Sequence, residues 1–564
     1  MRGPLPGPMP GLMMDFPLTL APLLERAGKL FGKVEIVSRR PDRTLARTTC
    51  ADFSRRALKL ARVLTDAGLT RGDRVATLMW NHSVHLEAYF GVPVAGGVLH
   101  TLNLRLHPDE IAAIANHAGD RFLLVDDVLL PLYEQFRSQV NFERVIVAPF
   151  GGGPVPGGMQ DYEQWLAQAG GDFACPALDE NDAATMCYTS GTTGRPKGVV
   201  YSHRALVLHS LASSTSDAFG IAQNDTVLLA ASMFHVNGWG VPFASVMFGS
   251  KLVFPGPHVN PSNLLHLIQQ EGVTVAFGVP TIWFGVAAEL ERNPGRWKLS
   301  RPLRINCGGA APPIELIRTL ARHNIELTHV FGMTESTPHL TASRLRSYMA
   351  GWPEEQQDAV RSMQGFPAPL VEMRVMRPAA LRGLPFVALD EQVQPAPEDE
   401  APRDGKTPGE LEIRGPWVAS SYYNAPEERD RWTADGWFRT GDVACVDEDG
   451  YIKIVDRIKD LIKSGGEWIS SVDMENALMG HPAVREAAVI GVPHPKLQER
   501  PLAVVVLNDG QQVTPEELRG FLAGRFAKWQ LPDAIVFAGE IPRTSVGKFK
   551  KSELRERYAK WEWE

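Results

Sequence analysis

A short run of glycines, hydroxyl side chains and one lysine is the segment of this chain with the most recognisable chemistry. Residues 188–198 read Tyr-Thr-Ser-Gly-Thr-Thr-Gly-Arg-Pro-Lys-Gly. The glycines allow the backbone to turn so that amide N–H groups converge on an anion. The hydroxyls and the ammonium group add side-chain donors to the same loop. The loop therefore suits a polyphosphate, and the residues expected around it are Thr189, Ser190, Gly191, Thr192, Thr193, Gly194 and Lys197.

The spacing of this loop differs from that of a Walker A loop, which has a longer spacer between its glycines and a Ser or Thr after its lysine. Here two residues separate Gly191 from Gly194, and Gly198 follows Lys197. The hydroxyl that holds magnesium in a P-loop NTPase is missing, which argues against γ-phosphoryl transfer. A Gly/Ser/Thr-rich surface turn is the alternative, but the Lys-Gly ending and the apolar strand that follows favour a phosphate loop.

Four further motifs follow this loop along the chain. They are residues 331–335 (FGMTE), 438–442 (FRTGD), 456–466 (DRIKDLIKSGG) and 542–548 (PRTSVGK). In this order the five motifs resemble those of the adenylate-forming superfamily, from about Met14 to the carboxyl end. The segments KDLIKSGGEWISS and MFHVNGW make the chain most similar to bacterial medium- and long-chain fatty-acid–CoA ligases.

The resemblance implies an enzyme with two half-reactions. The carboxylate of a fatty acid attacks the α-phosphate of Mg-ATP, which gives acyl-AMP and pyrophosphate. The sulfur of coenzyme A then attacks the acyl-adenylate, which gives acyl-CoA and AMP. Mg²⁺, ATP, coenzyme A and a fatty acid are therefore the expected cofactor and substrates, and a homodimer is expected because related bacterial ligases are often dimeric.

Several motif residues have the chemistry to hold a nucleotide. Glu335 carries a hard oxygen for magnesium, and Thr334 offers a hydroxyl to the α-phosphate or carboxylate. Asp442 has two oxygens that match paired ribose hydroxyls, and Arg457 can reach the same ribose. Taken alone, the first motif could be a solvated Thr-Glu at a helix start and Asp442 a plain turn aspartate.

The adenine ring is expected between two backbone segments. Phe331 supplies a flat face, at a position where many relatives have Tyr. The other expected nucleotide contacts are Gly308, Gly309, Ala310, Gly332 and Met333. Thr189 is expected beside Glu335 as a metal ligand.

Lys548 is expected to be the principal catalytic cation, together with Thr189, Thr334 and Glu335. It lies in a Gly-flanked turn, and its ammonium group can stabilise the transition state at the α-phosphate electrostatically. Lys550 and Lys551 are interpreted as surface charge.

The boundary between two domains is expected at residues 456–459, where the sequence pattern changes to that of a compact unit. By resemblance, Lys459 is the hinge about which the small domain rotates between the half-reactions. Rotation withdraws Lys548 and presents the residues expected to serve the thioester step, which are Lys463, Ser464, Gly465, Gly466 and Trp468.

The acyl pocket is expected at His235, Val236, Asn237, Gly238 and Trp239. In similar ligases the His lies near the carboxylate and the Trp partly closes the acyl tunnel. Gly238 and Gly240 are expected to leave room around Trp239, which favours the gate over a Trp packed for stability alone. Residues 279–283 are expected to line the same cavity, and the absence of an acidic residue in the motif argues against amino-acid activation.

Three rival functions remain open at this point. An aryl or short-chain CoA ligase differs only in pocket volume, and an adenylating enzyme with another acceptor shares the first half-reaction. A degenerate nucleotide sensor requires broken catalytic positions, whereas Lys197, Glu335, Asp442 and Lys548 are all intact. Nothing points to luciferase-like oxygenation.

Alternating helix and strand signals predict an α/β fold with parallel sheets covered by helices. Ala57, Leu60, Ala61 and Leu64 form one helical stripe, and residues 74–80 and 122–127 read as strands. We expect a disordered extension at 1–13, a large adenylation domain at 14–455, a hinge at 456–459 and a small mobile α/β domain at 460–564. Residues 377–408 read as an exposed excursion.

Composition narrows the setting. The formal net charge of −7 gives no support to a nucleic-acid role. Five scattered cysteines predict a reducing compartment, and neither a signal sequence nor an apolar run long enough for a bilayer is found. We expect a cytoplasmic protein and leave peripheral membrane contact open, although no basic amphipathic helix stands out.

Overall fold

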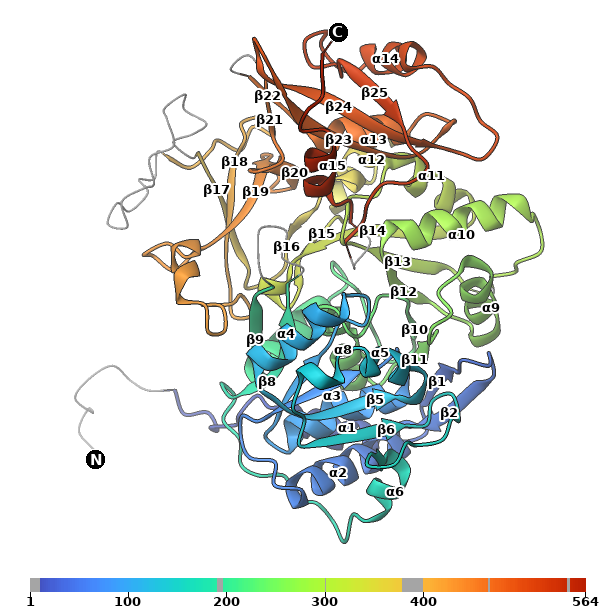
Figure 1. Ribbon diagram of the computed structural model, residues 1–564, viewed down its shortest axis with the longest axis vertical. Coiled ribbons are helices and arrows are strands. Elements are labelled where there is room, and N and C mark those ends of the chain that lie inside the picture. Colours follow the sequence, from blue (N-terminus) through green and yellow to red (C-terminus); the bar gives the residue numbers. More distant parts are fainter. Residues whose placement is uncertain are drawn as a thin grey trace.

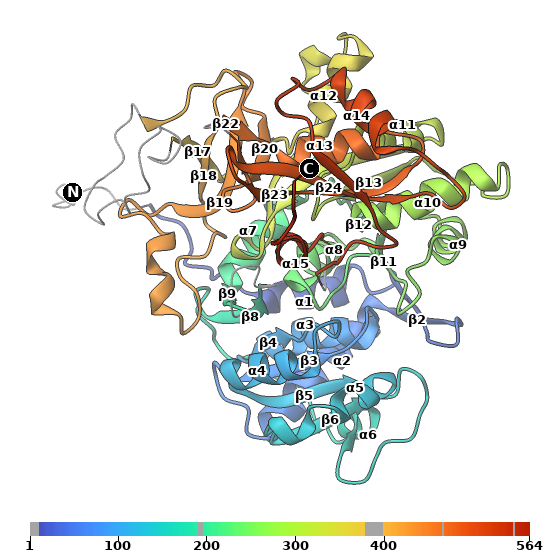
Figure 2. The same cartoon turned by 45° about the horizontal axis from the view of Figure 1, so that its top comes forward.

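The computed structural model describes residues 11–189, 196–299, 301–377, 399–464, 467–544 and 548–563, without the side chains of Glu467 and Trp468. Within these residues the chain forms four β-sheets with helices around them (Figure 1). Figures 1 and 2 both place the blue amino-terminal sheet at one end of the molecule, away from the red carboxyl-terminal unit. The predicted extension at 1–13 and excursion at 377–408 lie largely outside the described residues.

The first sheet has seven strands in the order β7-β6-β5-β3-β4-β8-β9, parallel except for the pair β8 and β9. Its strands are β3 (Arg74–Leu78), β4 (Val98–Thr101), β5 (Asp120–Asp126), β6 (Arg144–Ala148), β7 (Gln160–Asp161), β8 (Ala183–Tyr188) and β9 (Gly198–Ser202). The accompanying helices are α2 (Cys50–Asp66), α3 (Ser83–Val94), α4 (Pro108–Ala118), α5 (Leu130–Glu134), α6 (Tyr162–Ala167) and α7 (His203–Ser213). Because β4 and β8 are parallel neighbours, the loops after them leave the sheet at the same edge.

The second sheet has nine strands in the order β16-β15-β14-β13-β12-β10-β11-β1-β2. Its strands are β1 (Glu35–Arg39), β2 (Leu45–Thr49), β10 (Thr226–Leu229), β11 (Lys251–Phe254), β12 (Val275–Gly278), β13 (Leu303–Cys307), β14 (Ile325–Gly332), β15 (His339–Ala342) and β16 (Phe366–Pro367). The accompanying helices are α1 (Leu20–Leu30), α8 (Val241–Phe248), α9 (Pro261–Glu271), α10 (Pro280–Arg292), α11 (Ile314–Arg322) and α12 (Glu354–Ser362). Buried side chains of both large sheets, such as Leu99 and Val227, belong to one continuous core.

Two smaller sheets complete the fold. The third is antiparallel and consists of β17 (Glu372–Met376), β18 (Gly409–Arg414), β19 (Phe438–Val446) and β20 (Ile452–Arg457). The fourth consists of β21 (Ile462–Ser464), β22 (Glu467–Ile469), β23 (Val484–His494), β24 (Gln498–Leu507) and β25 (Ala534–Phe537). Its helices are α13 (Ser471–Met479), α14 (Pro515–Ala523) and α15 (Lys551–Arg557), and its apolar side chains form cores of their own.

Local signals in the sequence account for several of these elements. The helical stripe lies in α2, and the two predicted strands are β3 and β5. Pro108 opens α4, which ends at Gly119 with φ 66°. Thr514 and Glu517 form the capping box of α14. The α/β fold class is therefore confirmed.

The predicted hinge overlaps regular structure. Asp456 and Arg457 belong to β20 and pair with Val443 and Asp442 of β19. The turn that follows is closed by hydrogen bonds from the N–H groups of Asp460 and Leu461 to the carbonyl of Arg457, both of 2.9 Å. The domain limits stay a prediction. No helix of the described residues is long and apolar enough to cross a membrane.

Candidate active site

A cavity of about 1190 Å³ lies where segments from all four sheets meet. Most of the predicted site residues line it: Thr189, Lys197, His235, Val236, Trp239, Gly308, Gly309, Ala310, Phe331, Gly332, Met333, Thr334, Glu335, Asp442, Arg457, Lys459 and Lys548. Asn237, Gly238, Lys463 and Ser464 are described but do not line it. Ser190, Gly191, Thr192, Thr193, Gly194, Gly465, Gly466 and the side chain of Trp468 lie outside the described residues.

Glu335 is a nearly buried carboxylate in the short turn between β14 and β15. The hydroxyl of Tyr422 donates a hydrogen bond of 2.5 Å to its Oε1. The hydroxyl of Tyr201 donates to the backbone carbonyl of Thr334 at 2.7 Å. Thr334 and Glu335 are therefore each held by a tyrosine hydroxyl. Burial raises the pKa of Tyr422 far above its usual value, which keeps its hydroxyl a donor. Sequence reasoning missed Tyr422, because nothing in the local pattern near residue 422 points to a residue 87 positions away.

Asp442 and Arg457 face each other across β19 and β20. The Nε of Arg457 lies 2.6 Å from Oδ1 of Asp442. This carboxylate raises the pKa of Arg457, so the guanidinium stays charged. Oδ2 of Asp442 is buried and accepts no hydrogen bond from the described residues. A buried acceptor without a donor is costly, and a ribose hydroxyl is a donor that fits it.

Lys548 reaches this site from the carboxyl-terminal unit. Its N–H donates to Oγ1 of Thr544 at 3.2 Å, and its carbonyl accepts from the N–H of Thr544 at 2.7 Å. The side chain is open to the cavity, yet the surrounding protein lowers the pKa of Lys548 by excluding bulk water and through the charge of Arg457. Asp442 and Glu335 oppose this shift, so both carboxylates lie close enough to act on the ammonium group.

The neck of the glycine-rich loop is closed by its two described ends. The N–H of Thr189 donates to the carbonyl of Lys197 at 2.9 Å, and the N–H of Lys197 donates to Oγ1 of Thr189 at 3.2 Å. Nζ of Lys197 lies 2.7 Å from Glu428 and 5.4 Å from the ring centre of Tyr422. The lysine is therefore held beside Glu335 through the same tyrosine that binds the carboxylate.

Two glycines allow the backbone segments at the predicted adenine site to come close together. A Cβ atom on Gly332 would lie 1.9 Å from the carbonyl oxygen of Pro338, and one on Gly308 would lie 2.7 Å from that of Val330. No side chain fits at either position. The cavity wall formed by residues 308–310 and 331–333 therefore exposes backbone to a flat ligand.

The predicted acyl segment divides into two parts. His235, Val236 and Trp239 line the cavity, as expected. Asn237 instead points into the protein, where its amide oxygen accepts from Oγ1 of Thr185 at 2.8 Å and its nitrogen donates to Oγ1 of Thr101 at 3.1 Å. The prediction for Asn237 is wrong because a buried amide is best satisfied by these hydroxyls.

The expectation for the two glycines is also wrong. A Cβ atom on Gly238 would meet Pro242 at 3.2 Å, and one on Gly240 would meet the ring of His209 at 2.4 Å. Both glycines also have positive φ, so they are required by the turn and by these neighbours rather than by free space around Trp239. Residues 279–282 line the cavity as predicted, whereas Trp283 is fully buried and does not.

His235 is uncharged in the physiological range. Burial, followed by the charges of Lys548 and Arg105, lowers the pKa of His235 to about 3. A neutral imidazole can exchange hydrogen bonds with a carboxylate or its adenylate without adding a charge. Arg105 was not predicted, although its place just after β4 assigns it to the same sheet edge as the phosphate loop.

Of the residues predicted for the thioester step, the described Lys463 and Ser464 do not line the cavity. Ser464 pairs with Gln498 in the fourth sheet, and its hydroxyl accepts from Arg500 at 2.9 Å. The N–H of Lys463 donates to Glu499 at 3.0 Å. In this arrangement Lys548 lines the cavity, whereas Lys463 and Ser464 make their described contacts within the fourth sheet.

The small domain docks on β20 through the first turn of α13. The hydroxyl of Ser470 donates to the carbonyl of Val455 at 2.6 Å, and the N–H of Ser471 donates to Oδ2 of Asp456 at 2.8 Å. Lys551 contacts the same turn, since its Nζ lies 2.6 Å from Oγ of Ser471 and 2.7 Å from Oε1 of Glu475. The interpretation of Lys551 as surface charge is wrong, because the buried carboxylate of Glu475 draws its ammonium group inward.

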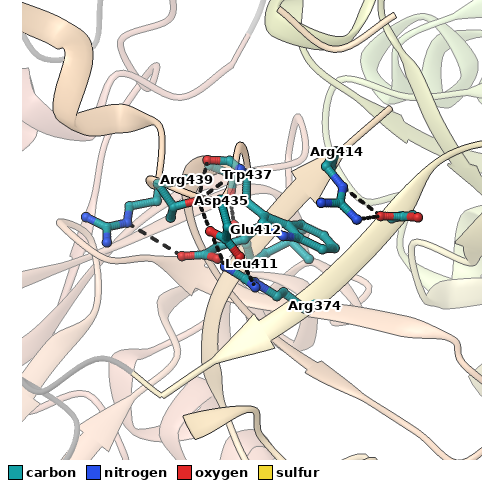
Figure 3. Close-up of polar contacts among 10 residues, drawn as sticks. Arg374, Leu411, Glu412, Arg414, Asp435, Trp437 and Arg439 are labelled. Atoms are coloured by element: carbon teal, nitrogen blue, oxygen red, sulfur yellow. Dashed lines mark hydrogen bonds and ion pairs between the residues drawn. The ribbon is translucent and has the colours of Figure 1, made fainter. Parts of the chain in front are cut away.

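Charged side chains on strands of the third sheet and on the loop before β19 form a cluster of ion pairs (Figure 3). Arg374 lies 2.7 Å from Glu412 and 2.8 Å from Asp435, while Arg439 lies 3.5 Å from Glu412. The indole of Trp437 lies between the guanidinium groups of Arg374 and Arg414, whose Cζ atoms are 4.4 and 4.6 Å from its ring centre. Since Arg439 and Asp442 share β19, the cluster supports the strand that presents Asp442.

These features are those of an adenylate-forming enzyme, and the chain belongs to the family of AMP-binding enzymes. Residues 25–423 match the AMP-binding enzyme family, and residues 473–548 match the AMP-binding enzyme C-terminal domain. A long-chain-fatty-acid–CoA ligase of Thermus thermophilus is 48% identical over 99% of this chain and 99% of its own. A 3-methylmercaptopropionyl-CoA ligase of Ruegeria lacuscaerulensis is 41% identical over 98% of this chain and 99% of its own. The solved structure of ATP-bound MatB from Rhodopseudomonas palustris is 26% identical, with a TM-score of 0.79 over 97% of this chain and 99% of that chain.

Proposed function

We propose that this protein is an AMP-forming ligase that joins a medium- or long-chain fatty acid to coenzyme A. The observation that carries the proposal is the convergence of Glu335, Asp442, Arg457 and Lys548 on one cavity. The same cavity has an apolar part, lined by Val236, Trp239, Val279, Ile282 and Phe284. A charged end beside an apolar wall is the arrangement that a nucleotide and a fatty acid need together.

In the first half-reaction, a carboxylate oxygen of the fatty acid forms a bond to the α-phosphorus of ATP. The bond from that phosphorus to the bridging oxygen breaks, and pyrophosphate leaves. Lys548 stabilises the negative charge that gathers on the α-phosphate, and its place beside Asp442 and Glu335 supports this role. Asp442 accepts from the ribose through its free Oδ2.

The donor set also fits the Mg²⁺ that accompanies ATP. Glu335 has a buried carboxylate with one oxygen oriented by Tyr422, and it lies on the cavity wall. Among the described residues, no group of three or more His, Cys, Asp or Glu could form a full protein cage for a metal. None is needed, because Mg²⁺ at phosphates commonly uses one or two carboxylates and completes its shell with phosphate and water. When bound, the ion neutralises phosphate charge, and we propose Glu335 with Thr189 as its protein ligands.

In the second half-reaction, the sulfur of coenzyme A forms a bond to the acyl carbon, the bond to the adenylate oxygen breaks, and AMP leaves. We propose that the small domain rotates about Lys459 between the two steps. Rotation separates α13 from β20 and withdraws Lys548. It brings Lys463, Ser464, Gly465, Gly466 and Trp468 to the acyl-adenylate.

The test is turnover of purified protein with Mg-ATP, coenzyme A and single acids from acetate to oleate. Pyrophosphate, AMP and acyl-CoA are quantified by mass. Equal amounts of AMP and thioester, with a maximum at medium or long chains, are expected. Pyrophosphate and acyl-AMP without thioester would exclude coenzyme A as the acceptor.

A short thioether acid is the second candidate substrate, since the Ruegeria lacuscaerulensis relative is a 3-methylmercaptopropionyl-CoA ligase. The same series should therefore include 3-methylmercaptopropionate. A kcat/KM for this acid above that for every fatty acid would assign the chain to the short-acid ligases and leave both half-reactions unchanged.

We propose further that the enzyme is a cytoplasmic homodimer. The free cysteines of the described residues, Cys50, Cys175, Cys187, Cys307 and Cys445, support a reducing compartment. Dimerisation rests on the resemblance to bacterial ligases. Light scattering after size-exclusion chromatography gives the mass in solution, and a monomer at micromolar concentration would contradict the proposal.

A further inference from the structure

Arg105 lies in the wall of the cavity, in the segment between β4 and α4. Its Cζ atom lies 5.7 Å from the ring centre of Phe234, the residue before His235. Its backbone N–H donates to Oδ1 of Asn103 at 3.0 Å, which fixes the turn that carries the side chain. The local hydrogen bond therefore holds the backbone of this turn, and the guanidinium lies over an aromatic ring that also lines the cavity.

The guanidinium of Arg105 has no carboxylate opposite it among the described residues. Other cations of the cavity do, since Lys197 lies 2.7 Å from Glu428 and Arg457 lies 2.6 Å from Asp442. Burial lowers the pKa of Arg105, with no compensating effect from an acidic neighbour. The side chain is nevertheless exposed in the unliganded protein, so its guanidinium is accessible to an anionic ligand in the cavity.

Two independent features indicate where that anion lies. The charges of Arg105 and Lys548 both act on the imidazole of His235, so the guanidinium is near the reacting end of the cavity. In addition, β4 is the parallel neighbour of β8, and β8 leads directly into the glycine-rich loop. The segment of Arg105 thus leaves the sheet at the same edge as Thr189, and both residues line the cavity together with Lys197.

We propose that Arg105 binds an anionic oxygen of the substrates, namely the β- and γ-phosphates of ATP that leave as pyrophosphate. This assignment rests on the proposed function. A guanidinium can bind phosphate oxygens bidentately, and pyrophosphate carries more charge than any other part of the bound substrates. The second source of the same chemistry is the carboxylate of the fatty acid, and the experiment separates the two.

The experiment measures Mg-pyrophosphate and AMP binding by isothermal titration calorimetry for wild type, Arg105→Met and Arg105→Lys. It also measures the KM for ATP and for the acid in the forward reaction. A charge-assisted contact of this kind changes affinity by roughly 10- to 100-fold. We expect Arg105→Met to weaken pyrophosphate binding by this factor and to raise the KM for ATP. AMP binding and the KM for the acid stay unchanged, and Arg105→Lys recovers part of the loss.

Arg296→Met is the matched control, because Cζ of Arg296 also lies over an aromatic ring, 4.7 Å from the centre of Trp297, but outside the cavity. It should leave pyrophosphate binding at the wild-type value. A rise in the KM for the acid alone would overturn the assignment in favour of the carboxylate, and unchanged pyrophosphate binding in Arg105→Met would overturn it altogether. Thermal unfolding of each variant excludes misfolding. If wild type binds pyrophosphate through Arg105 but makes no acyl-CoA, the proposed function fails and this contact stands.

Discussion

The hydroxyl of Tyr422 should control how well Glu335 serves the adenylation step. Tyr422→Phe removes one oxygen atom and leaves the ring, which lies against Lys197 and Trp432. The lost bond joins the hydroxyl to a carboxylate that is only 8% exposed. A hydrogen bond to a charged group contributes about 1.5–3 kcal/mol. A loss of about 2 kcal/mol corresponds to a decrease of roughly 30-fold.

We expect this decrease in kcat/KM for Mg-ATP, because Glu335 then lacks the donor that orients it toward the phosphates. The assay is acid-dependent exchange between pyrophosphate and ATP at several Mg²⁺ concentrations. Tyr423→Phe is the control, since this neighbour contacts the edge of His117 rather than the carboxylate. Its exchange rate should lie within about two-fold of wild type.

Two results would refute the reasoning. Wild-type exchange in Tyr422→Phe at limiting Mg²⁺ would mean that the carboxylate is positioned without the hydroxyl. An equal loss in Tyr423→Phe would mean that the segment, and not the hydrogen bond, is what matters. Matching urea unfolding curves for the three proteins ensure that the comparison concerns the site.

Four further predictions follow from the same geometry. Lys548→Ala should reduce the rate of acyl-AMP formation about 100- to 1000-fold and leave the rate of thioester formation from supplied acyl-AMP unchanged. Both rates are measured in single turnovers. An equal decrease in both would contradict the role of Lys548. Lys459→Pro should leave acyl-AMP formation unchanged and reduce thioester formation. A Lys459→Pro variant that makes thioester at the wild-type rate would exclude Lys459 as the hinge. The pKa of His235 is about 3 in the folded protein, below that of the unfolded side chain. As the pH falls below about 6.5, the unfolded state therefore binds a proton that the folded state does not. The free energy of unfolding decreases over this pH range. Replacement by Gln should therefore remove a destabilisation of about 2 kcal/mol at pH 5, seen as a smaller drop in melting temperature from pH 7 to pH 5 than in wild type. Arg374→Met leaves the buried carboxylate of Glu412 with only a 3.5 Å contact to Arg439. The free energy of unfolding, measured in urea, should therefore decrease by about 3–5 kcal/mol. The double variant with Glu412→Met should regain part of that free energy.

Local chemistry is what the sequence determined without help from the fold. Pro108 and Gly119 mark the ends of α4, and Thr514 forms the capping box of α14, because each effect acts within one turn of backbone. Alternating helix and strand signals were enough to predict the fold class, and the order of the five motifs predicted the family, which the family match confirms. Each of the five motifs contributes at least one described residue to the cavity, among them Glu335, Asp442 and Lys548.

The sequence alone did not predict the orientation of individual side chains within a motif. Asn237 and Trp239 are two residues apart, yet one turns inward to Thr185 and the other faces the cavity. Lys550 and Lys551 read alike as surface charge, but Lys551 finds the buried Glu475 while the side chain of Lys550 remains 52% exposed. Such choices depend on which partner lies opposite, and the partner comes from another element.

The tertiary structure alone decided which distant groups meet. Tyr422 and Glu335 are 87 positions apart and share a hydrogen bond. Lys548 comes under the charges of Arg457, Asp442 and Glu335 because the small domain docks on β20. Arg105 reaches the environment of His235 because Asn237, two residues after His235, donates a hydrogen bond to Thr101 at the end of β4. Residue types and short spacings state which chemistry is available, whereas long-range strand pairing and domain docking bring the groups within the few ångströms at which that chemistry acts.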